Sequence, residues 1–220
     1  MVYITGDLHG DLTRLSDPAL RRLRRGDLLL VCGDFGFIWD GGEQEQKRLK
    51  KLAKSKYTIA FLDGRHENFD LLAQYPTEVW NGAPAQKINE RAYHLLRGEI
   101  YDIEGHSFFT FGGGESDDKE FRIPGESWWE AERPTEAEMA RARENLAARD
   151  NRVDYILTHM PSPKSRARLD TRTPAEGVSI FLGALEETVT CKGWFFGCLH
   201  RDKRLSAQRR AVFRDVVPIE

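Results

Sequence analysis

The chain has 220 residues, of which 40% are hydrophobic and 31% are charged, and 33 basic against 35 acidic side chains leave a net charge of −2. This composition is typical of a soluble globular protein, and its near-neutral balance gives no general attraction to nucleic acid or to an anionic membrane surface. The longest apolar runs, such as residues 28–32, are far shorter than the roughly 20 residues that cross a bilayer, which argues against a membrane protein.

In chain order, the first third alternates short apolar runs with polar segments of helical periodicity. Each apolar run ends in a Gly-Asp or Asp-Gly pair, the kind of turn signal that stops a strand. The pattern predicts strands at 2–5, 27–32 and 57–62 and helices at 11–24, 43–56 and 67–74. Pro18 can restart the first helix, since proline is tolerated in a first helical turn.

The pattern then changes to short strand candidates that predict a meander of adjacent strands at 93–96, 99–103 and 107–111. A long loop follows over 115–133. Thr135 with Glu138 three residues later is a capping-box signal for a helix to about residue 149. The remaining chain predicts a strand at 153–157, a polar loop at 162–175, a helix at 176–188, a strand at 194–196 and a final hairpin within 204–217.

No internal repeat and no long linker divides the sequence, so we expect residues 1–220 to form a single domain of the α/β class. Three cysteines, Cys32, Cys191 and Cys198, are too few and too scattered for a disulfide framework. This favours a reducing, cytoplasmic location.

Polar residues follow five of the predicted strands at the point where each strand ends. They are Asp7, His9, Asp34, His66, His159 and His200. One such aspartate alone is often a turn former, and one such histidine alone is more often structural than a ligand. Because ligands of open α/β sheets bind beyond the carboxyl ends of strands, the joint pattern predicts a common site. His94 and His106 lack this context, and we expect them to be ordinary packed or surface residues.

Carboxylate and imidazole together suit a divalent ion such as Mn, Fe or Zn. A carboxylate can also bridge two such ions about 3.5–4 Å apart, a geometry that favours displacement at a phosphoester. The residue types therefore predict a metal centre.

The same motifs resemble those of the calcineurin-like metallophosphoesterases. The segments 6–10 (GDLHG), 33–34 (GD), 64–67 (GRHE), 158–159 (TH) and 197–200 (GCLH) follow the family order GDxHG, GD, GNH(E/D), H and GHxH. The resemblance covers nearly the whole chain, and the loop 112–132 resembles a small bacterial and phage-type subgroup. It implies a four-layer α/β/β/α sandwich and hydrolysis of a phosphodiester or phosphomonoester by attack of metal-bound hydroxide.

Carried over residue by residue, the resemblance implies that Asp7, His9 and His200 hold a first metal and that Asp34 bridges to a second. His159 would hold the second metal. His66 would protonate or stabilise the leaving oxygen. The implied partner is a phosphoester substrate, not a membrane; nucleic-acid binding is left open but is not indicated by the charge.

Two residues depart from the family pattern, and both fall at the second metal. Arg65 replaces an asparagine ligand and Cys198 replaces a histidine ligand. Arginine has no acceptor and a permanent charge, so it cannot ligate a cation, whereas a thiolate is a good ligand for Zn or Fe. We therefore expect one tightly bound metal and a doubtful second site.

Three hypotheses follow from these departures. In the first, a phosphoesterase uses one strong metal, and Arg65 supplies the missing positive charge at the phosphate. In the second, two metals bind, the second through Cys198. In the third, the chain is a degenerate family member that binds a phosphorylated ligand or partner without turnover. Because the ligands of the first site and His66 are all present, the sequence favours a catalytic protein over one that only binds.

The loop over 112–132 carries further candidates. Trp128 and Trp129 are expected to anchor the loop on the core or, alternatively, to form a wall of the substrate cleft. Lys119 and Arg122 are expected either to meet a phosphate or to be solvated surface charges.

Overall fold

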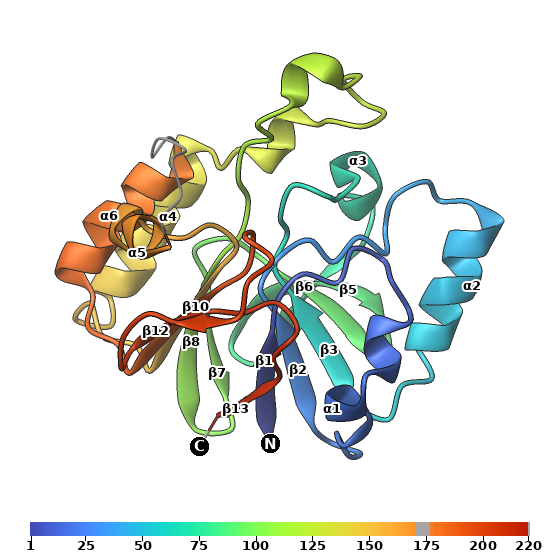
Figure 1. The fold of residues 1–220 in the computed structure, drawn as a ribbon, viewed down its shortest axis with the longest axis horizontal. Coiled ribbons are helices and arrows are strands. Elements are labelled where there is room, and N and C mark those ends of the chain that lie inside the picture. Colours follow the sequence, from blue (N-terminus) through green and yellow to red (C-terminus); the bar gives the residue numbers. More distant parts are fainter. Residues whose placement is uncertain (170–176, 220) are drawn as a thin grey trace.

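The computed structural model describes residues 1–169 and 177–219 as two β-sheets packed face to face, with helices against both outer faces (Figure 1). This is the predicted four-layer α/β/β/α arrangement, which is confirmed. Among the described residues, no helix is both long and apolar enough to cross a membrane.

The first sheet has seven strands in the order β13-β1-β2-β3-β6-β5-β4 within the described chain. Its central strands β1, β2, β3 and β6 run parallel, and β13 and β5 pair antiparallel at either side. The strands are β1 (Val2–Thr5), β2 (Leu28–Val31), β3 (Thr58–Phe61), β4 (Thr77–Trp80), β5 (Ala83–Asn89), β6 (Ala92–Leu95) and β13 (Val217–Ile219).

The second sheet has six strands in the order β11-β12-β10-β9-β8-β7 within the same described residues. Strands β8, β9, β10 and β12 run parallel, and β7 and β11 are antiparallel at the edges. The strands are β7 (Ile100–Ile103), β8 (His106–Phe111), β9 (Tyr155–Thr158), β10 (Gly193–Phe196), β11 (Lys203–Arg204) and β12 (Arg209–Ala211).

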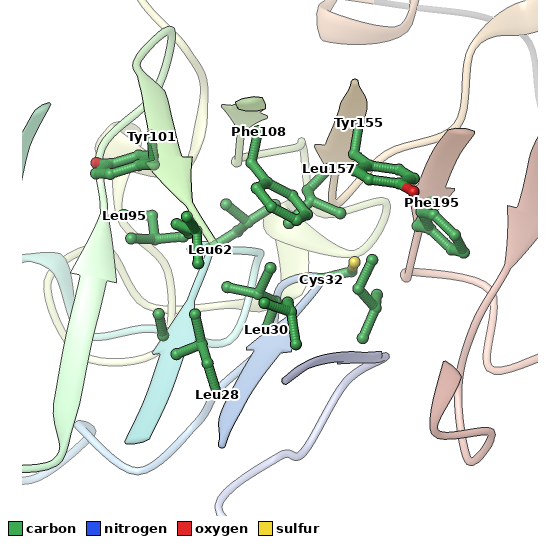
Figure 2. Packing of buried hydrophobic residues seen from close by; sticks show 14 of the residues in the cluster. Leu28, Leu30, Cys32, Leu62, Leu95, Tyr101, Phe108, Tyr155, Leu157 and Phe195 are labelled. Carbon is green, nitrogen blue, oxygen red and sulfur yellow. The ribbon is translucent and has the colours of Figure 1, made fainter. Parts of the chain in front are cut away.

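Apolar side chains of both sheets meet between them and form the central core. Successive residues of a strand point to opposite faces, so Leu28 and Leu30 of β2 face the other sheet while Leu29 and Val31 face the helices. Figure 2 shows Leu30 and Leu62 of the first sheet opposite Phe108 and Leu157 of the second. Strands buried on both faces explain the continuous apolar runs in the sequence.

Helices cover the two outer faces of the sandwich. The first sheet is covered by α1 (Pro18–Arg21), α2 (Glu43–Leu52) and α3 (Phe69–Leu72), and the second by α4 (Glu136–Ala147), α5 (Pro163–Arg168) and α6 (Val178–Thr188) (Figure 1). The predicted capping box of α4 forms, with reciprocal bonds between Thr135 and Glu138.

The predicted meander is wrong. Strand β6 belongs to the first sheet, whereas β7 and β8 belong to the second, so the chain changes sheets between Leu95 and Ile100. Gly98 makes this turn at φ +80°, and a Cβ there would meet Ala142 of α4 at 3.0 Å. The sequence reasoning also missed β4 and β5, whose two-residue Asn81-Gly82 turn has φ +48° and +87°, a common hairpin turn geometry.

Three further predictions need correction. The predicted helix at 11–24 breaks at Asp17 into a 3-10 turn at Arg14–Ser16 and the short α1, which begins at Pro18 as the proline indicated. The predicted loop at 162–175 contains α5, capped by Ser162. Its residues 170–175 lie outside the described residues, as does residue 176, the predicted start of the next helix. The predicted final hairpin forms from β11 and β12, but the chain then adds β13 beside β1.

Candidate metal centre

The loops that follow five parallel strands bring the predicted polar residues together. Asp7 and His9 follow β1, Asp34 follows β2 and His66 follows β3 in the first sheet; His159 follows β9 and His200 follows β10 in the second. Since the two sheets pack face to face, their carboxyl ends form one site. The site therefore draws its side chains from both sheets, not from one sheet edge.

Four of these side chains lie close enough to contact a single ion. Asp7, His9, Asp34 and His200 each offer one ligating atom, and these atoms lie within 4.8 Å of one another. The Nε2 atoms of His9 and His200 are 2.8 Å apart, and His200 Nε2 is 3.1 Å from Asp7 Oδ2. His9 Nε2 is 3.9 Å from Asp34 Oδ2. The aspartates are buried and the histidines lie at the surface, so the cluster has a solvated side.

The cluster fits a divalent cation. Both carboxylates are buried, and histidines surround them: His200 Nε2 lies 3.1 Å from Asp7 Oδ2, and His159 Nε2 lies 3.5 Å from Asp34 Oδ1. Two buried carboxylates side by side are costly unless positive charge neutralises them. Burial lowers the pKa of His159, but the charges of Asp34, Cys198 and Asp7 outweigh it and raise that pKa to about 10. Two carboxylates and two imidazoles are a donor set for Mn, Fe or Zn.

Left-handed backbone conformations are concentrated in the loops of this site. His9, Asp34, Cys198 and His200 have φ of 50°, 43°, 67° and 48°. Such values are uncommon for residues other than glycine and persist only where the surrounding structure enforces them. These conformations occur where loops from strands of both sheets bring their side chains to one point.

Glycines in the motifs let the loops interlock. A Cβ at Gly64 would lie 2.0 Å from Asp34 Oδ1, and one at Gly197 would lie 2.3 Å from Asp7 Oδ1. Each glycine therefore makes room for a carboxylate that comes from a different strand. These positions require glycine because of close approach, not because of a turn.

Asp34 links the metal cluster to His66. Its Oδ1 accepts the backbone N–H groups of Arg65 at 2.5 Å and His66 at 3.0 Å, and its Oδ2 lies 4.0 Å from His66 Nε2. Burial raises the pKa of Asp34, but His159, His66, His9 and the Arg65 amide outweigh it and lower that pKa. Burial lowers the pKa of His66; the negative charge of Asp34 acts in the opposite direction, but the pKa remains below its ordinary value. The His66 ring is thus held beside the cluster but outside it.

The residues predicted for a second metal are arranged differently. His159 is fully buried, with Nδ1 3.2 Å from the Cys32 carbonyl oxygen and Nε2 3.5 Å from Asp34 Oδ1. Cys198 lies beside Met160, with the two sulfur atoms 3.3 Å apart, and its backbone N–H donates to Asp7 Oδ1. Within the part of the chain that the structure describes, no second set of three potential ligands converges. A second metal site remains a prediction.

Arg65 turns its side chain toward the long loop. Its Nη1 donates to the Glu115 carbonyl oxygen at 3.2 Å and lies 3.5 Å from Asp117 Oδ2, while its Nε is buried without a hydrogen-bond partner. Burial opposes its charge, but Cys198, Asp34 and Asp117 outweigh this and raise the pKa of Arg65. The guanidinium therefore stays charged, with Nη1 directed at the long loop.

The loop 112–132 projects beyond the carboxyl ends of the strands (Figure 1). Trp129 is buried and donates from Nε1 to Asp70 of α3 at 2.9 Å, while Trp128 donates to Glu132 within the loop at 2.7 Å. Trp129 thus anchors the loop on α3, the first of the two predicted roles, whereas the contact of Trp128 is internal to the loop. A role as a wall of the substrate cleft remains a prediction. Lys119 and Arg122 each pair with an acid of the same loop, Glu115 and Asp118 respectively.

Sequence reasoning missed a buried ion-pair network behind the site. Asp63, the residue before Gly64, accepts from Arg97 Nη2 at 2.5 Å and lies 3.1 Å from His94 Nε2. Burial raises the pKa of Asp63, but Arg97 and His94 hold it well below its ordinary value. His94 is packed, as expected, but as part of this network. A buried charge triad leaves no periodic signal in a single sequence, so nothing in the pattern could have revealed it.

Comparison with known proteins gives one family and a distant fold likeness. The sequence model of the calcineurin-like phosphoesterases matches residues 1–201. A search of curated proteins finds no significant match. A Staphylococcus aureus structure described as a 5'-nucleotidase, in complex with alpha-ketoglutarate, shares 14% identity at a TM-score of 0.50 and is matched over 97% of this chain and 48% of that one. This chain therefore spans about half of that protein's length. The phosphopantetheinyl hydrolase of Mycobacterium tuberculosis shares 17% identity at a TM-score of 0.43, over 96% of this chain and 89% of that one.

Proposed function

This chain belongs to the calcineurin-like phosphoesterase family, and we propose that it hydrolyses a phosphodiester or phosphomonoester with one tightly bound divalent ion. The observation that carries the proposal is the convergence of Asp7, His9, Asp34 and His200 within 4.8 Å, with both carboxylates buried. His66 beside this cluster adds a group suited to proton transfer.

The four clustered side chains would hold the ion, with Mn, Fe or Zn suited to the donor set. When bound, the ion would act as a Lewis acid toward the phosphoryl group and lower the pKa of water. The chain itself fixes the ligand geometry, because buried Asp7 and Asp34 are held by backbone N–H groups from neighbouring loops. His9 and His200 close the solvated side.

We assign His66 to the leaving oxygen. Its Nε2 is 4.0 Å from Asp34 Oδ2, so the ring lies next to the cluster without being one of its four members. An imidazole in that place can donate an N–H to the oxygen that departs from phosphorus. The backbone N–H of His66 donates to Asp34, and this hydrogen bond fixes the position of His66 relative to the four ligands.

We assign Arg65 to the phosphoryl oxygens, in place of a second cation. Its backbone hydrogen bond to Asp34 Oδ1 and the attraction of its charge to Asp34 support this role, because a charged guanidinium is a strong donor to phosphate. The alternative of a second metal held by Asp34, His159 and Cys198 is less supported, since the convergent ligand group of the described residues is Asp7, His9, Asp34 and His200, which includes neither His159 nor Cys198.

Metal analysis and turnover test the proposal together. Protein purified without chelator should carry about one divalent ion per chain and should hydrolyse para-nitrophenyl phosphate or its bis(para-nitrophenyl) diester. Removal of the metal should abolish turnover, and its return should restore it. The ratio of the two rates would separate monoesterase from diesterase. Metal-loaded protein that turns over neither ester would favour the alternative, a family member that binds a phosphorylated ligand or partner without hydrolysis.

A further inference from the structure

A small cavity lies beside the metal cluster. It has a volume of about 290 Å³ and is lined by His9, Gly36, Trp39, Arg48 and His66. Ligand pockets commonly have volumes of roughly 300–1,000 Å³, so this cavity suits a small chemical group and not a macromolecule. Two of its walls, His9 and His66, belong to the centre described above. The other three residues have no assigned role.

Arg48 of α2 brings a positive charge to this cavity and has no partner there. It makes no ion pair or hydrogen bond with any residue of 1–169 or 177–219, and its Nε is buried and unsatisfied. Its Nη1 lies 3.7 Å from the position that a Cβ on Gly10 would take, so the guanidinium reaches the loop that carries His9. A partly buried charge without a partner is unfavourable and is relieved by an anion.

The acidic side chains near this cavity are already engaged elsewhere. Glu45 accepts the backbone N–H groups of residues 39 and 40, at 2.6 and 2.8 Å. Glu67 accepts those of residues 35 and 36, and Asp40 accepts that of Gly42. On α2 itself, Glu43 pairs with Lys47. None of these carboxylates neutralises Arg48, so its charge is available to a ligand.

Trp39 forms a rigid aromatic wall of the cavity. Its ring centroid is 6.4 Å from that of His66 and 5.4 Å from that of Trp129, which it meets edge to face. Trp129 is in turn fixed by its hydrogen bond to Asp70. The wall is therefore set before any ligand arrives, which favours binding of a flat or apolar group beside the charge.

We infer that this cavity binds the leaving-group part of the substrate and that Arg48 binds a second anionic group on it, a carboxylate or a phosphate. The inference rests on the proposed function, because the leaving part must lie next to His66, the residue assigned to the leaving oxygen. His66 lines the cavity. The substrate class is thus a small phosphoester whose leaving group carries its own negative charge.

Binding of unreactive analogues to the metal-loaded protein tests the inference. Benzylphosphonate carries the phosphoryl mimic alone, para-carboxybenzylphosphonate adds a carboxylate, and para-xylylenediphosphonate adds a second phosphonate. Calorimetry should show that at least one of the two analogues with a second anionic group binds about 10–100-fold more tightly than benzylphosphonate, as expected for a hydrogen bond between charged groups. The better of the two identifies the carboxylate or the phosphate as the preferred group.

Matched variants assign the preference to Arg48. Arg48→Met keeps most of the apolar stem and should reduce the affinity ratio to about one, whereas Arg48→Lys should retain part of it. Lys51→Met removes the same charge from an exposed position of α2 and should leave the ratio as in the wild type. Thermal unfolding by circular dichroism would show that each variant is folded.

Two results would overturn the inference. One is that neither analogue with a second anionic group binds the wild type more tightly than benzylphosphonate does; the other is a preference that survives in Arg48→Met. These outcomes are separate from failure of the proposed function, which turnover of the para-nitrophenyl esters decides. Turnover without a charge preference removes the anion site alone. A charge preference without turnover supports the anion site in a protein that does not hydrolyse those esters.

Discussion

Asp34 is predicted to have two separable roles, and two substitutions distinguish them. Its side chain is only 3% exposed and is one of the four clustered ligands, while its Oδ1 accepts two backbone N–H groups. Asp34→Asn keeps an acceptor oxygen for both N–H groups but loses the charge. Asp34→Ala loses both. The two variants therefore share the loss of a metal ligand and differ by two hydrogen bonds.

The expected difference in stability follows from that count. A hydrogen bond contributes about 0.5–1.5 kcal/mol net, so two bonds make Asp34→Ala less stable than Asp34→Asn by about 1–3 kcal/mol in metal-free protein. Both variants should lose metal affinity by more than the roughly 10–100-fold typical of a residue that only supports a ligand. Turnover should be lost in both, most completely in Asp34→Ala.

Urea unfolding of chelator-treated protein measures the first quantity, and metal analysis after dialysis measures the second. His106→Asn is the matched control, since His106 lies on β8 and packs against Phe108 and Tyr155, outside the metal cluster. It should retain metal and turnover. Equal stability of the two Asp34 variants would show that the N–H groups of Arg65 and His66 find other acceptors. Retention of one ion per chain in either variant would falsify the ligand assignment.

Three other predictions concern neighbouring residues. His66→Asn should lower turnover by about 10²–10⁴-fold with the metal content unchanged, and unchanged turnover would show that His66 only packs. Arg65→Asn combined with Cys198→His should raise the metal content from about one ion per chain toward two, because the changes introduce the asparagine and histidine ligands of the family pattern. Histidine tolerates the left-handed φ of 67° at position 198, and a stoichiometry that stays at one would contradict the prediction. Arg97→Met should destabilise the protein by about 3–5 kcal/mol in urea unfolding at neutral pH, since it removes the guanidinium paired with buried Asp63 and leaves that carboxylate with His94 alone. Because Arg97 and His94 lower the pKa of folded Asp63 despite its burial, the extra stability of the wild type should be present above about pH 4, the ordinary Asp pKa, and shrink as the pH falls below it; a difference that is constant with pH would refute the pairing.

The strand-end motifs were predictable because the signal is local. Buried parallel strands are short apolar runs, and each run here ends in a turn that carries an aspartate or a histidine. Once strands such as β1 and β2 are placed side by side, Asp7 and Asp34 must lie near each other. The resemblance of the motifs to one family added the layer order. The sequence could therefore indicate the sandwich and the four clustered residues.

The partner of each strand was not predictable in the same way. Residues 93–111 were predicted to form one meander because the local pattern of a strand does not indicate which sheet the strand joins. The sheet change at Gly98 depends on close packing of that glycine against Ala142, which lies 44 residues further along the chain. Likewise, the last strand β13 pairs with β1 across almost the whole sequence length.

The sequence by itself showed that aspartate and histidine follow the predicted strands, and these residue types indicate a metal centre. This was possible because strand pattern and turn preference are properties of neighbouring residues. Only the tertiary structure decided how those groups are used. It showed that Arg65 turns toward Glu115, that Arg48 reaches the loop of His9 without a partner, and that Asp63 is buried against Arg97. Such relations depend on burial and on distances between segments far apart in the chain. They arise when the sheets and helices pack, and no local pattern encodes them.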